Sequence, residues 1–346
     1  MKVGWYVHHH GAGHRTRAMV VGACLAARGA DVTLLGSELD HPATLSADLT
    51  PVRLALDHPL ASEGSPERDD VTAGGLMHWA PLRHGGFAER MTTIARWIQV
   101  QEPDVLVVDV SCEVALLVRL LGVPVIVVAQ PGERLDPPHF AALAAATAVL
   151  APWPAWAGAK LWDTQAITAP VVAVGGLAKK PEVASRPRGP VGVTPLADRT
   201  PVGLVLSGSD GFDRRDLPEI VARSAPDVDW TVVGGSRWVP DVHKLIAGAD
   251  VVVTHAGQNA IADVAAAGVP AVVVPQRRPF GEQDHMADVL ASSGLATTVM
   301  REDVATVDWA AAVDGVLARG GGGWQRWACE GAVERAASLV ESVAHG

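Results

Sequence analysis

The sequence predicts an α/β protein with two doubly wound parallel-sheet (Rossmann-like) domains that face a cleft. Its 346 residues exceed one ordinary domain and suit two. Short apolar, β-branched runs alternate with helical stretches, which is typical of parallel sheets covered by helices. Each half also opens with a strand whose glycine-rich turn leads into a helix. With 49% hydrophobic and 19% charged residues, the chain has enough apolar side chains for two cores.

The composition also predicts the domain boundaries. Residues 175–200 are dense in Pro, Gly and basic side chains without any period, as is typical of a linker. We therefore expect an N-terminal domain over residues 1–178, a linker over 179–200 and a C-terminal domain over 201–323. The amphipathic pattern of residues 324–346 predicts one long terminal helix after a break at four successive glycines.

Strands are expected wherever a short apolar run is bounded by polar or turn residues. In the first half these runs occupy residues 2–7, 31–35, 103–110, 124–129, 147–151 and 170–174. In the second half they occupy residues 202–206, 230–233, 250–253, 269–275 and 297–300. Helices are expected over residues 18–28, 77–101 (with a break near Gly85), 111–121, 217–224, 261–268, 284–293 and 308–319. Residues 62–75 are polar and rich in Gly and Pro, so we expect a loop there.

Charge and cysteine usage narrow the class of protein. A net charge of −10 without any Lys/Arg-rich block disfavours a nucleic-acid partner. The three cysteines, Cys24, Cys112 and Cys329, lie far apart without a CxxC pair, so they signal neither a disulfide framework nor a structural zinc site. We therefore expect the cysteines to be reduced thiols. We also expect a cytoplasmic protein, since no export signal and no apolar run of about 18 residues is present.

Three tryptophans close together raise the question of membrane contact. Trp153, Trp156 and Trp162 surround two prolines and offer an apolar surface for peripheral contact with lipid or an apolar acceptor. The alternative is packing at an irregular domain edge. We favour packing, because no basic amphipathic helix accompanies them.

The second half carries its strongest functional pattern at one strand-to-helix turn. His255 and Gly257 follow a buried strand and precede a helix, whose N–H groups and positive dipole end favour a phosphate. Asp263 lies about two turns into that helix. Glu282 and Gln283 follow the end of the next strand. Ligands bind outside the carboxyl ends of parallel strands, so these residues predict a site for a nucleotide that carries a sugar.

Two further loops of the second half follow strand ends. Ser207, Gly208 and Ser209 form a short Gly/Ser loop that leads into a helix and predicts a second anion-binding turn, with a plain turn as the alternative. Trp238 and Val239 lie in the loop after the next strand.

The first half places a histidine in its first glycine-rich turn. Gly11 and Gly13 match two positions of the dinucleotide fingerprint, but the third position holds Thr16, so an NAD site is disfavoured. His14 in this loop is suited to take a proton near neutral pH. The alternative is a histidine that caps the helix or bonds to the loop.

A carboxylate at a neighbouring strand end is a candidate partner for His14. Asp109 ends a strongly apolar run, and a carboxylate behind an imidazole fixes its tautomer and raises its basicity. A cap for the helix that follows is the alternative role for Asp109, and Glu133 is the alternative carboxylate. Residues 8–10 are all histidines, but neighbours on a strand point to opposite faces, so they cannot all bind one ion.

These motifs resemble those of the GT-B nucleotide-sugar glycosyltransferases, both the MurG type and the small-molecule type. The resemblance implies that the turn at His255 and Gly257 holds a diphosphate, that the shorter Asp263 replaces the usual ribose-binding Glu, and that Glu282 and Gln283 bind the sugar. The spaced residues that carry it are His255, Gly257, Gln258, Asn259, Asp263, Pro275, Glu282 and Gln283.

The same resemblance assigns the remaining loops. It implies that Ser207, Gly208 and Ser209 hold the diphosphate and that Trp238 and Val239 contact the base. The G-x-G-H turn that contains His14 resembles the N-terminal motif of MurG-type enzymes, in which this histidine is the proposed base.

The N-terminal domain is implied to bind the acceptor, and the terminal helix to cross back onto it. Our candidates for acceptor binding are His10, Gly13, Arg17 and Glu133. Arg17 departs from the MurG pattern, because G-H-x-x-R resembles a branch that includes nucleotide-sugar hydrolases.

We therefore predict an inverting hexosyltransferase with a UDP-type donor, GlcNAc or another hexose as the sugar, and a small-molecule or lipid-linked acceptor. No cofactor beyond the nucleotide-sugar co-substrate and no metal is expected, because Asp69 and Asp70 lie in a loop rather than at a phosphate position. The alternatives are a nucleotide-sugar hydrolase that uses His14, a 2-epimerase of this fold, and a non-catalytic nucleotide-binding module.

Overall fold

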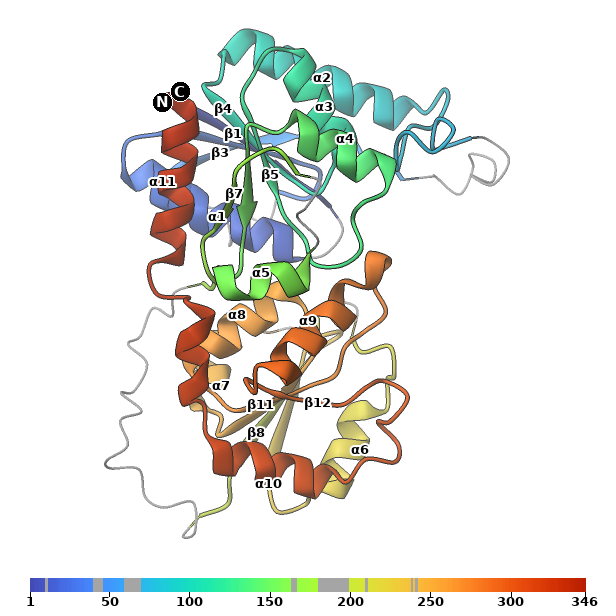
Figure 1. Ribbon diagram of the computed structural model, residues 1–346, viewed down its shortest axis with the longest axis vertical. Coiled ribbons are helices and arrows are strands. Elements are labelled where there is room, and N and C mark those ends of the chain that lie inside the picture. Colours follow the sequence, from blue (N-terminus) through green and yellow to red (C-terminus); the bar gives the residue numbers. More distant parts are fainter. Residues whose placement is uncertain are drawn as a thin grey trace. The chain divides into compact units, whose positions relative to one another are not determined.

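The computed structural model describes residues 1–9, 12–39, 46–58, 70–162, 167–179, 199–208, 211–237, 239 and 242–346. The chain forms two compact units (Figure 1). Unit 1 contains Met1–Ala155, Asp163–Val174 and Gly331–Gly346. Unit 2 contains Trp156–Trp162 and Gly175–Glu330.

Unit 1 is built on a seven-stranded parallel sheet with the order β3-β2-β1-β4-β5-β6-β7. The central strands β1 and β4 are short, apolar and almost wholly buried, as expected for strands covered on both faces. The strands are β1 (Lys2–Val7), β2 (Asp31–Gly36), β3 (Leu49–Arg53), β4 (Val105–Asp109), β5 (Val125–Val128), β6 (Ala148–Ala151) and β7 (Val171–Ala173).

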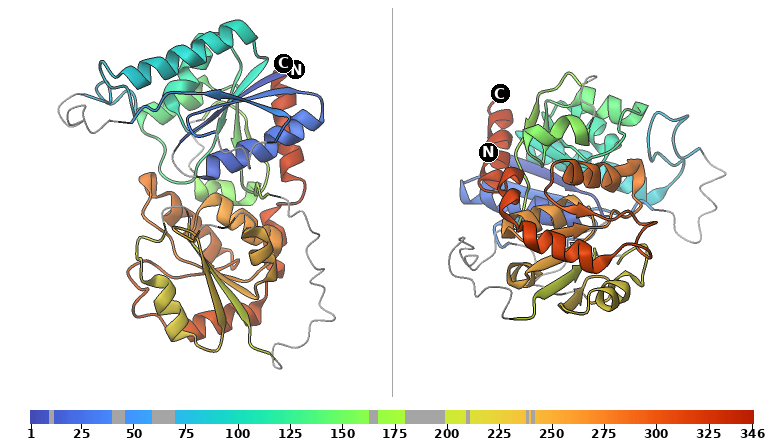
Figure 2. Two further views of the ribbon diagram at one scale, coloured as in Figure 1. Left: turned by 180° about the vertical axis from the view of Figure 1, so that it is seen from behind. Right: turned by 60° about the horizontal axis from the view of Figure 1, so that its bottom comes forward.

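Helices cover both faces of this sheet. α1 packs with α11 on one face, and α2, α3 and α4 pack together on the other (Figures 1 and 2). The helices are α1 (Ala12–Ala27), α2 (Gly85–Gln101), α3 (Cys112–Leu120), α4 (Pro137–Ala145) and α11 (Ala332–Ala344). Side chains fix two of their starts: Ser111 accepts the N–H of Val114 to cap α3, and His84 accepts that of Phe87 to cap α2.

Unit 2 repeats the pattern with a five-stranded parallel sheet in the order β12-β11-β10-β8-β9. Its strands are β8 (Val202–Leu206), β9 (Asp229–Val233), β10 (Val251–Thr254), β11 (Ala271–Val273) and β12 (Thr297–Thr298). Its helices are α5 (Ala155–Leu161), α6 (Leu217–Ser224), α7 (Val242–Gly248), α8 (Gln258–Ala267), η2 (Pro279–Gly281), α9 (Glu282–Ser292), α10 (Trp309–Arg319) and η3 (Gly322–Trp327). α7 packs against α8, and α10 packs against α6 and the sheet (Figure 1).

The C-terminal segment differs from the single long helix that we predicted. It forms the short η3 in unit 2 and then α11 in unit 1, because Ala328 and Gly331 adopt positive φ values of 55° and 70°. The buried Trp324 anchors η3 by donating its indole N–H to the carbonyl of Val269 at 2.8 Å. α11 packs on α1 and β4 instead. Amphipathic periodicity continued across both pieces, and so the pattern hid the break.

The helix that we predicted over residues 77–101 is also shorter in the structure. α2 begins at Gly85, and the preceding segment is turn and loop. Gly86 is needed here, because a Cβ on it would lie 2.0 Å from the carbonyl oxygen of Leu56. The helix therefore starts where the chain passes closely over the loop after β3.

The tryptophan cluster is mostly core. Trp153 and Trp162 are 1% and 2% exposed, so neither can contact lipid. Trp156 is 38% exposed and packs edge-on against Trp327, with its indole N–H donated to the carbonyl of Arg326 at 2.9 Å. Within the described ranges, no helix is both long and apolar enough to cross a membrane.

Candidate active site

Each sheet reverses its strand order once, and ligands of doubly wound folds bind at such a switch point. In unit 1 the reversal lies between β1 and β4, where the carboxyl-end residues Val7 and Asp109 are paired in register. In unit 2 it lies between β8 and β10, where Leu206 and Thr254 are paired. The loops and helices that follow these four strands contain most of the site residues that we predicted.

In unit 1 the switch point brings His14 and Asp109 together. His14 is the third residue of α1, and its Nδ1 lies 2.9 Å from Oδ1 of Asp109 at the end of β4. Asp109 is 0% exposed, whereas the His14 side chain retains 19% exposure. A carboxylate can only accept, so Nδ1 of His14 carries the proton and its Nε2 carries the lone pair.

Asp109 is held by two further side chains. Arg17, one turn along α1 from His14, places Nε 3.0 Å from Oδ2, and Gln130 donates to Oδ1 at 3.4 Å. Burial alone raises the pKa of Asp109, but Arg17 and His14 outweigh it and bring the pKa below its ordinary value. Asp109 is therefore ionised near neutral pH and presents a negative charge to His14.

These contacts correct two expectations. Arg17 is 2% exposed and pairs with Asp109, so it supports the histidine–carboxylate pair instead of binding an acceptor as predicted. Asp109 does not cap the following helix, because Ser111 does so. The alternative carboxylate, Glu133, is exposed in the loop after β5.

The backbone directly after Asp109 is strained. Val110 has a φ of 68°, in the left-handed region that a β-branched residue rarely adopts. Such a conformation costs about 1–3 kcal/mol and persists where surrounding structure enforces it, often at functional sites. Here it turns the chain between Asp109 and Ser111, so that one residue meets His14 and the other caps α3.

A buried polar cluster lies beneath the histidine-rich segment. Arg90 is 0% exposed and donates to Tyr6 Oη at 2.9 Å and to Ser37 Oγ at 2.6 Å. Its Nε lies 3.2 Å from Oδ2 of Asp57, whose Oδ1 lies 3.5 Å from Nδ1 of His9. The cluster joins the ends of β1 and β2 to the loop after β3. Sequence reasoning missed it, because an arginine in a helix usually indicates a solvated surface.

The neighbouring His8 belongs to the same segment. Its ring stacks on His9 with centroids 4.7 Å apart and meets the ring of His14 edge-on at 6.0 Å. His8 therefore borders His14, and His9 lies behind His8 against Asp57. His10, a predicted acceptor contact, lies outside the described residues, and Gly13 lies in the first turn of α1.

In unit 2 the switch point presents His255. The backbone N–H of Gly257 donates to its Nδ1 at 3.0 Å, so the proton of the neutral ring is on Nε2. Nε2 faces the loop after β8, since a Cβ on Gly208 would lie 3.5 Å from it. Gly257 is also the N-cap of α8 and brings no capping side chain to that helix terminus. An N–H donor and a helix N-terminus thus lie close together at this turn, and both favour an anion.

The loop after β8 is tied to the loop after β9. The N–H of Ser207 donates to the carbonyl of Val233 at 3.0 Å, and the carbonyl of Gly208 accepts from Gly235 at 2.9 Å. The amide of Ser207 is thus used inside the protein, which corrects our expectation that it binds a diphosphate. Gly208 still borders His255. Ser209 and Trp238 lie outside the described residues, and Val239 is half-buried.

Gln283 connects two loops at the carboxyl edge of the sheet. Its carbonyl oxygen accepts the N–H groups of Ala256 at 3.1 Å and of Gln276 at 2.9 Å, and the side chain is 3% exposed. The side chain of Gln276 in turn accepts the N–H of Asp213 at 2.6 Å. Gln283 therefore holds the His255 turn in place, and its oxygen is used inside the protein. Sugar binding by Gln283 stays a prediction. Gln276 and Asp213 were not foreseen.

Asp263 lies on α8 in a largely buried position. Its Oδ1 accepts the backbone N–H of Lys179 at 3.3 Å and lies 3.6 Å from Nδ1 of His243. Burial raises the pKa of Asp263 to about 7, although the Lys179 amide and charge act in the opposite direction. Of the other predicted donor residues, Gln258 and Asn259 open α8 and Glu282 opens α9.

Known structures identify the architecture. The chain aligns over 99% of its length with the glycotransferase of kitacinnamycin, covering 98% of that chain at a TM-score of 0.69 and 20% identity. MurG of Acinetobacter baumannii aligns over 99% of both chains at a TM-score of 0.66 and 16% identity. The fold is GT-B. Spinosyn rhamnosyltransferase SpnG complexed with thymidine diphosphate shares this fold, with a TM-score of 0.63 at 16% identity over 99% of this chain and 100% of that one.

Sequence comparisons agree with the GT-B resemblance that the motifs predicted, which is thereby confirmed. Residues 218–317 match the Glycosyltransferase family 28 C-terminal domain. This range lies in unit 2 and includes His255, Asp263 and Glu282.

Relatives match over part of their length. UDP-N-acetylglucosamine--N-acetylmuramyl-(pentapeptide) pyrophosphoryl-undecaprenol N-acetylglucosamine transferase of Nitratidesulfovibrio vulgaris (strain DP4) is 37% identical over 143 residues, 33% of this chain and 38% of the relative. The protein of the same name from Alcanivorax borkumensis is 34% identical over 174 residues, 41% of this chain and 48% of the relative. The chain thus spans less than half the length of each.

Proposed function

We propose that this GT-B protein is an inverting glycosyltransferase. It moves a hexose, with N-acetylglucosamine as one candidate, from a UDP-type nucleotide donor to an acceptor hydroxyl. The observation that carries the proposal is the 2.9 Å contact between His14 and the buried Asp109, which makes Nε2 of an accessible histidine the basic nitrogen. The family 28 domain over residues 218–317 supports a nucleotide-sugar donor.

In the proposed reaction His14 acts as the general base in unit 1. Its Nε2 takes the proton of the acceptor hydroxyl while the hydroxyl oxygen forms a bond to the anomeric carbon. Asp109 stabilises the imidazolium that results, and Arg17 keeps Asp109 ionised. The proton passes to solvent after transfer. Arg17 is thus a positioning residue that acts through Asp109.

The leaving group is the nucleoside diphosphate, held by unit 2. The bond between the anomeric carbon and the phosphate oxygen breaks with its electrons on that oxygen. The Nε2–H of His255 and the N-terminus of α8 meet the negative charge that develops there. We propose that Asp263 binds the ribose, that Glu282 binds sugar hydroxyls and that Val239 borders the base. The hydrogen-bond donors of His255 and of the α8 N-terminus support transfer without a metal ion at the diphosphate.

We propose a specialised small-molecule acceptor in preference to the lipid-linked precursor that the relatives' name describes. The support is His8, whose ring meets that of His14 edge-on and adds polar and aromatic surface where the acceptor would lie. Turnover on lipid-linked cell-wall precursor alone, in a screen that also contains aglycones of antibiotic type, would contradict this choice.

Nucleotide-sugar hydrolysis is the second candidate, and the G-H-x-x-R turn at His14 and Arg17 favours it. The two functions differ in what triggers donor cleavage. We would measure binding of UDP- and dTDP-sugars, and release of nucleoside diphosphate from each, with and without a panel of acceptors. Transfer predicts release that depends on an acceptor, and hydrolysis predicts equal release without one. Failure to bind any nucleotide would refute both.

A further inference from the structure

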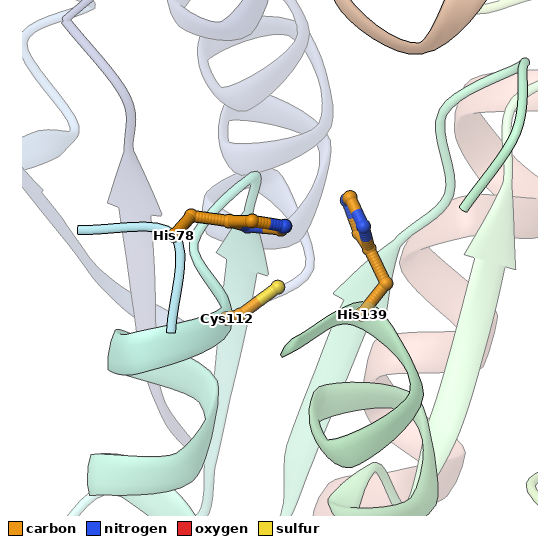
Figure 3. A group of neighbouring side chains, drawn as sticks. All are labelled: His78, Cys112 and His139. Carbon is orange, nitrogen blue, oxygen red and sulfur yellow. The ribbon is translucent and has the colours of Figure 1, made fainter. Parts of the chain in front are cut away.

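A second group of reactive side chains lies in unit 1, outside the His14–Asp109 pair. His78 comes from the segment before α2, Cys112 is the first residue of α3, and His139 lies in the first turn of α4. One ligand atom from each residue, two imidazole nitrogens and the Cys112 Sγ, lies within 4.8 Å of the others. Figure 3 shows the three side chains pointing toward a common centre from three different elements.

We propose that His78, Cys112 and His139 bind a zinc ion. Two imidazoles and one thiolate form the mixed nitrogen and sulfur set that zinc prefers, and this set excludes magnesium and calcium, which require oxygen ligands. Tetrahedral zinc with ligand bonds of about 2.0–2.3 Å holds its ligand atoms about 3.3–3.8 Å apart. The ligand atoms therefore need to approach one another by about 1.5 Å or less to close around an ion. A water molecule would complete the coordination.

Asp136 orients both imidazoles. Its Oδ2 lies 2.6 Å from Nε2 of His78, and its Oδ1 contacts Nδ1 of His139. Because the carboxylate only accepts, each nitrogen that faces it carries the proton, which leaves the opposite nitrogen of each ring as the basic one. Histidines that ligate a metal usually donate their second N–H to such a carboxylate. The geometry thus provides the outer support of a metal site as well as its ligands.

The backbone around the ligands is also fixed. Oε1 of Glu113 accepts the N–H of His78 at 2.8 Å and the N–H of Trp79 at 3.0 Å, which holds the His78 segment against the start of α3. Ser111 caps α3 one residue before Cys112. A site on anchored elements needs little ordering when an ion binds, so less of the binding free energy is lost to entropy.

Burial and charge suit a divalent cation. Cys112 is 6% exposed, whereas the side chains of His78 and His139 are 32% and 12% exposed, so an ion can enter from the histidine side. Asp136, Glu113 and Arg134 are the charged neighbours of Cys112. With Cys112 as a thiolate, these groups sum to a charge of about −2, which one zinc ion neutralises.

Arg134 is the group that opposes an ion. Its Nη1 lies 3.0 Å from Nε2 of His139, and its Nε donates to the carbonyl of Pro131 at 3.1 Å. In this arrangement the guanidinium donates a hydrogen bond to the basic nitrogen of His139, which is the nitrogen that a metal ion would bind. Zinc binding therefore requires the Arg134 head group to leave His139, and replacement of Arg134 should strengthen binding.

The test is a cobalt titration of the full chain after treatment with a chelator. Cobalt(II) replaces zinc in tetrahedral sites and reports a cysteine ligand through a thiolate charge-transfer band in the near ultraviolet. We expect one cobalt per chain with this band, and its loss when one equivalent of zinc is added. The histidine-rich segment at residues 8–10 has no thiol and so cannot produce the band.

Variants assign the ligands. Cys112→Ser should lose the band, and His78→Asn should weaken zinc binding about 100-fold while disturbing the core less, since His78 is the more exposed ligand. Arg134→Met should bind about fivefold more tightly or better. Cys24→Ser and Cys329→Ser are the matched controls and should behave as the wild type. A cobalt complex without the thiolate band, or equal zinc affinity in wild type and His78→Asn, would overturn the proposal.

Discussion

Gly257 offers a sharp test of the proposed diphosphate site, because a side chain at this position would collide with His255. A Cβ here would lie 2.5 Å from Cε1 and 2.7 Å from Nδ1 of His255. The φ of Gly257 is −71°, so alanine is compatible with the backbone and only the contact with the imidazole is at stake. The ring must move in Gly257→Ala, and the N–H···Nδ1 bond that sets its tautomer is lost.

The expected loss follows from the hydrogen bond that we propose His255 makes to the nucleotide. A hydrogen bond to a charged group contributes about 1.5–3 kcal/mol. Its removal should therefore weaken binding of the nucleoside diphosphate about 10- to 150-fold. The assay is calorimetric titration with UDP and dTDP, with thermal unfolding as the check that the variant folds.

The matched control is Gly315→Ala on α10. A Cβ there meets nothing within 4 Å, and alanine favours the helix, so nucleotide affinity should not change. A folded Gly257→Ala variant that binds nucleotide within about twofold of the wild type would refute the assignment of His255 to the diphosphate.

Three further substitutions test other parts of the site. Asp263→Asn tests the raised pKa of about 7. The native state keeps a proton that the unfolded chain loses near pH 4, so wild-type stability falls as pH rises from about 4 to about 7 and levels off above that. We expect the free energy of unfolding of the variant, relative to wild type, to rise between pH 5 and pH 8 by about 2–3 kcal/mol; a difference independent of pH contradicts the shift. Gln283→Leu leaves two buried N–H groups without their acceptor and should cost about 2–4 kcal/mol in denaturant unfolding, whereas the exposed Gln325→Leu should cost little. Arg17→Met removes the cation that lowers the pKa of Asp109, so the acid limb of the pH–rate profile should move to higher pH, and Arg17→Lys should restore part of it. An unmoved profile would show that Arg17 is only structural.

The elements that the sequence predicted best are those whose signal is local. The buried strands β1, β4, β8 and β10 are short apolar runs with polar ends, and the structure has each within two residues of the predicted bounds. Because parallel strands align their carboxyl ends, the contact of His14 with Asp109 also followed from chain order and topology. The same reasoning directed attention to the turn at His255.

The residue roles that the sequence did not predict depend on tertiary contacts. Arg17 is a charged residue of the kind that usually lies exposed, and only the fold, which brings α1 to the end of β4, shows that it is buried against Asp109. Gln283 is a polar residue after a strand, and only the fold brings two backbone N–H groups to its oxygen. His78 and Cys112 come from separate elements without a ligand-spacing motif, so no pattern signalled their proximity.

The central claim is that His14 is the general base of glycosyl transfer. The most direct measurement compares kcat for transfer, and the Kd of the donor, between wild type and His14→Ala. General-base catalysis contributes about 10²- to 10⁴-fold, so kcat should fall by that factor. The donor Kd should stay within about threefold, because the donor is assigned to unit 2 and His14 lies in unit 1. Transfer by His14→Ala at a rate within about fivefold of wild type would contradict the account.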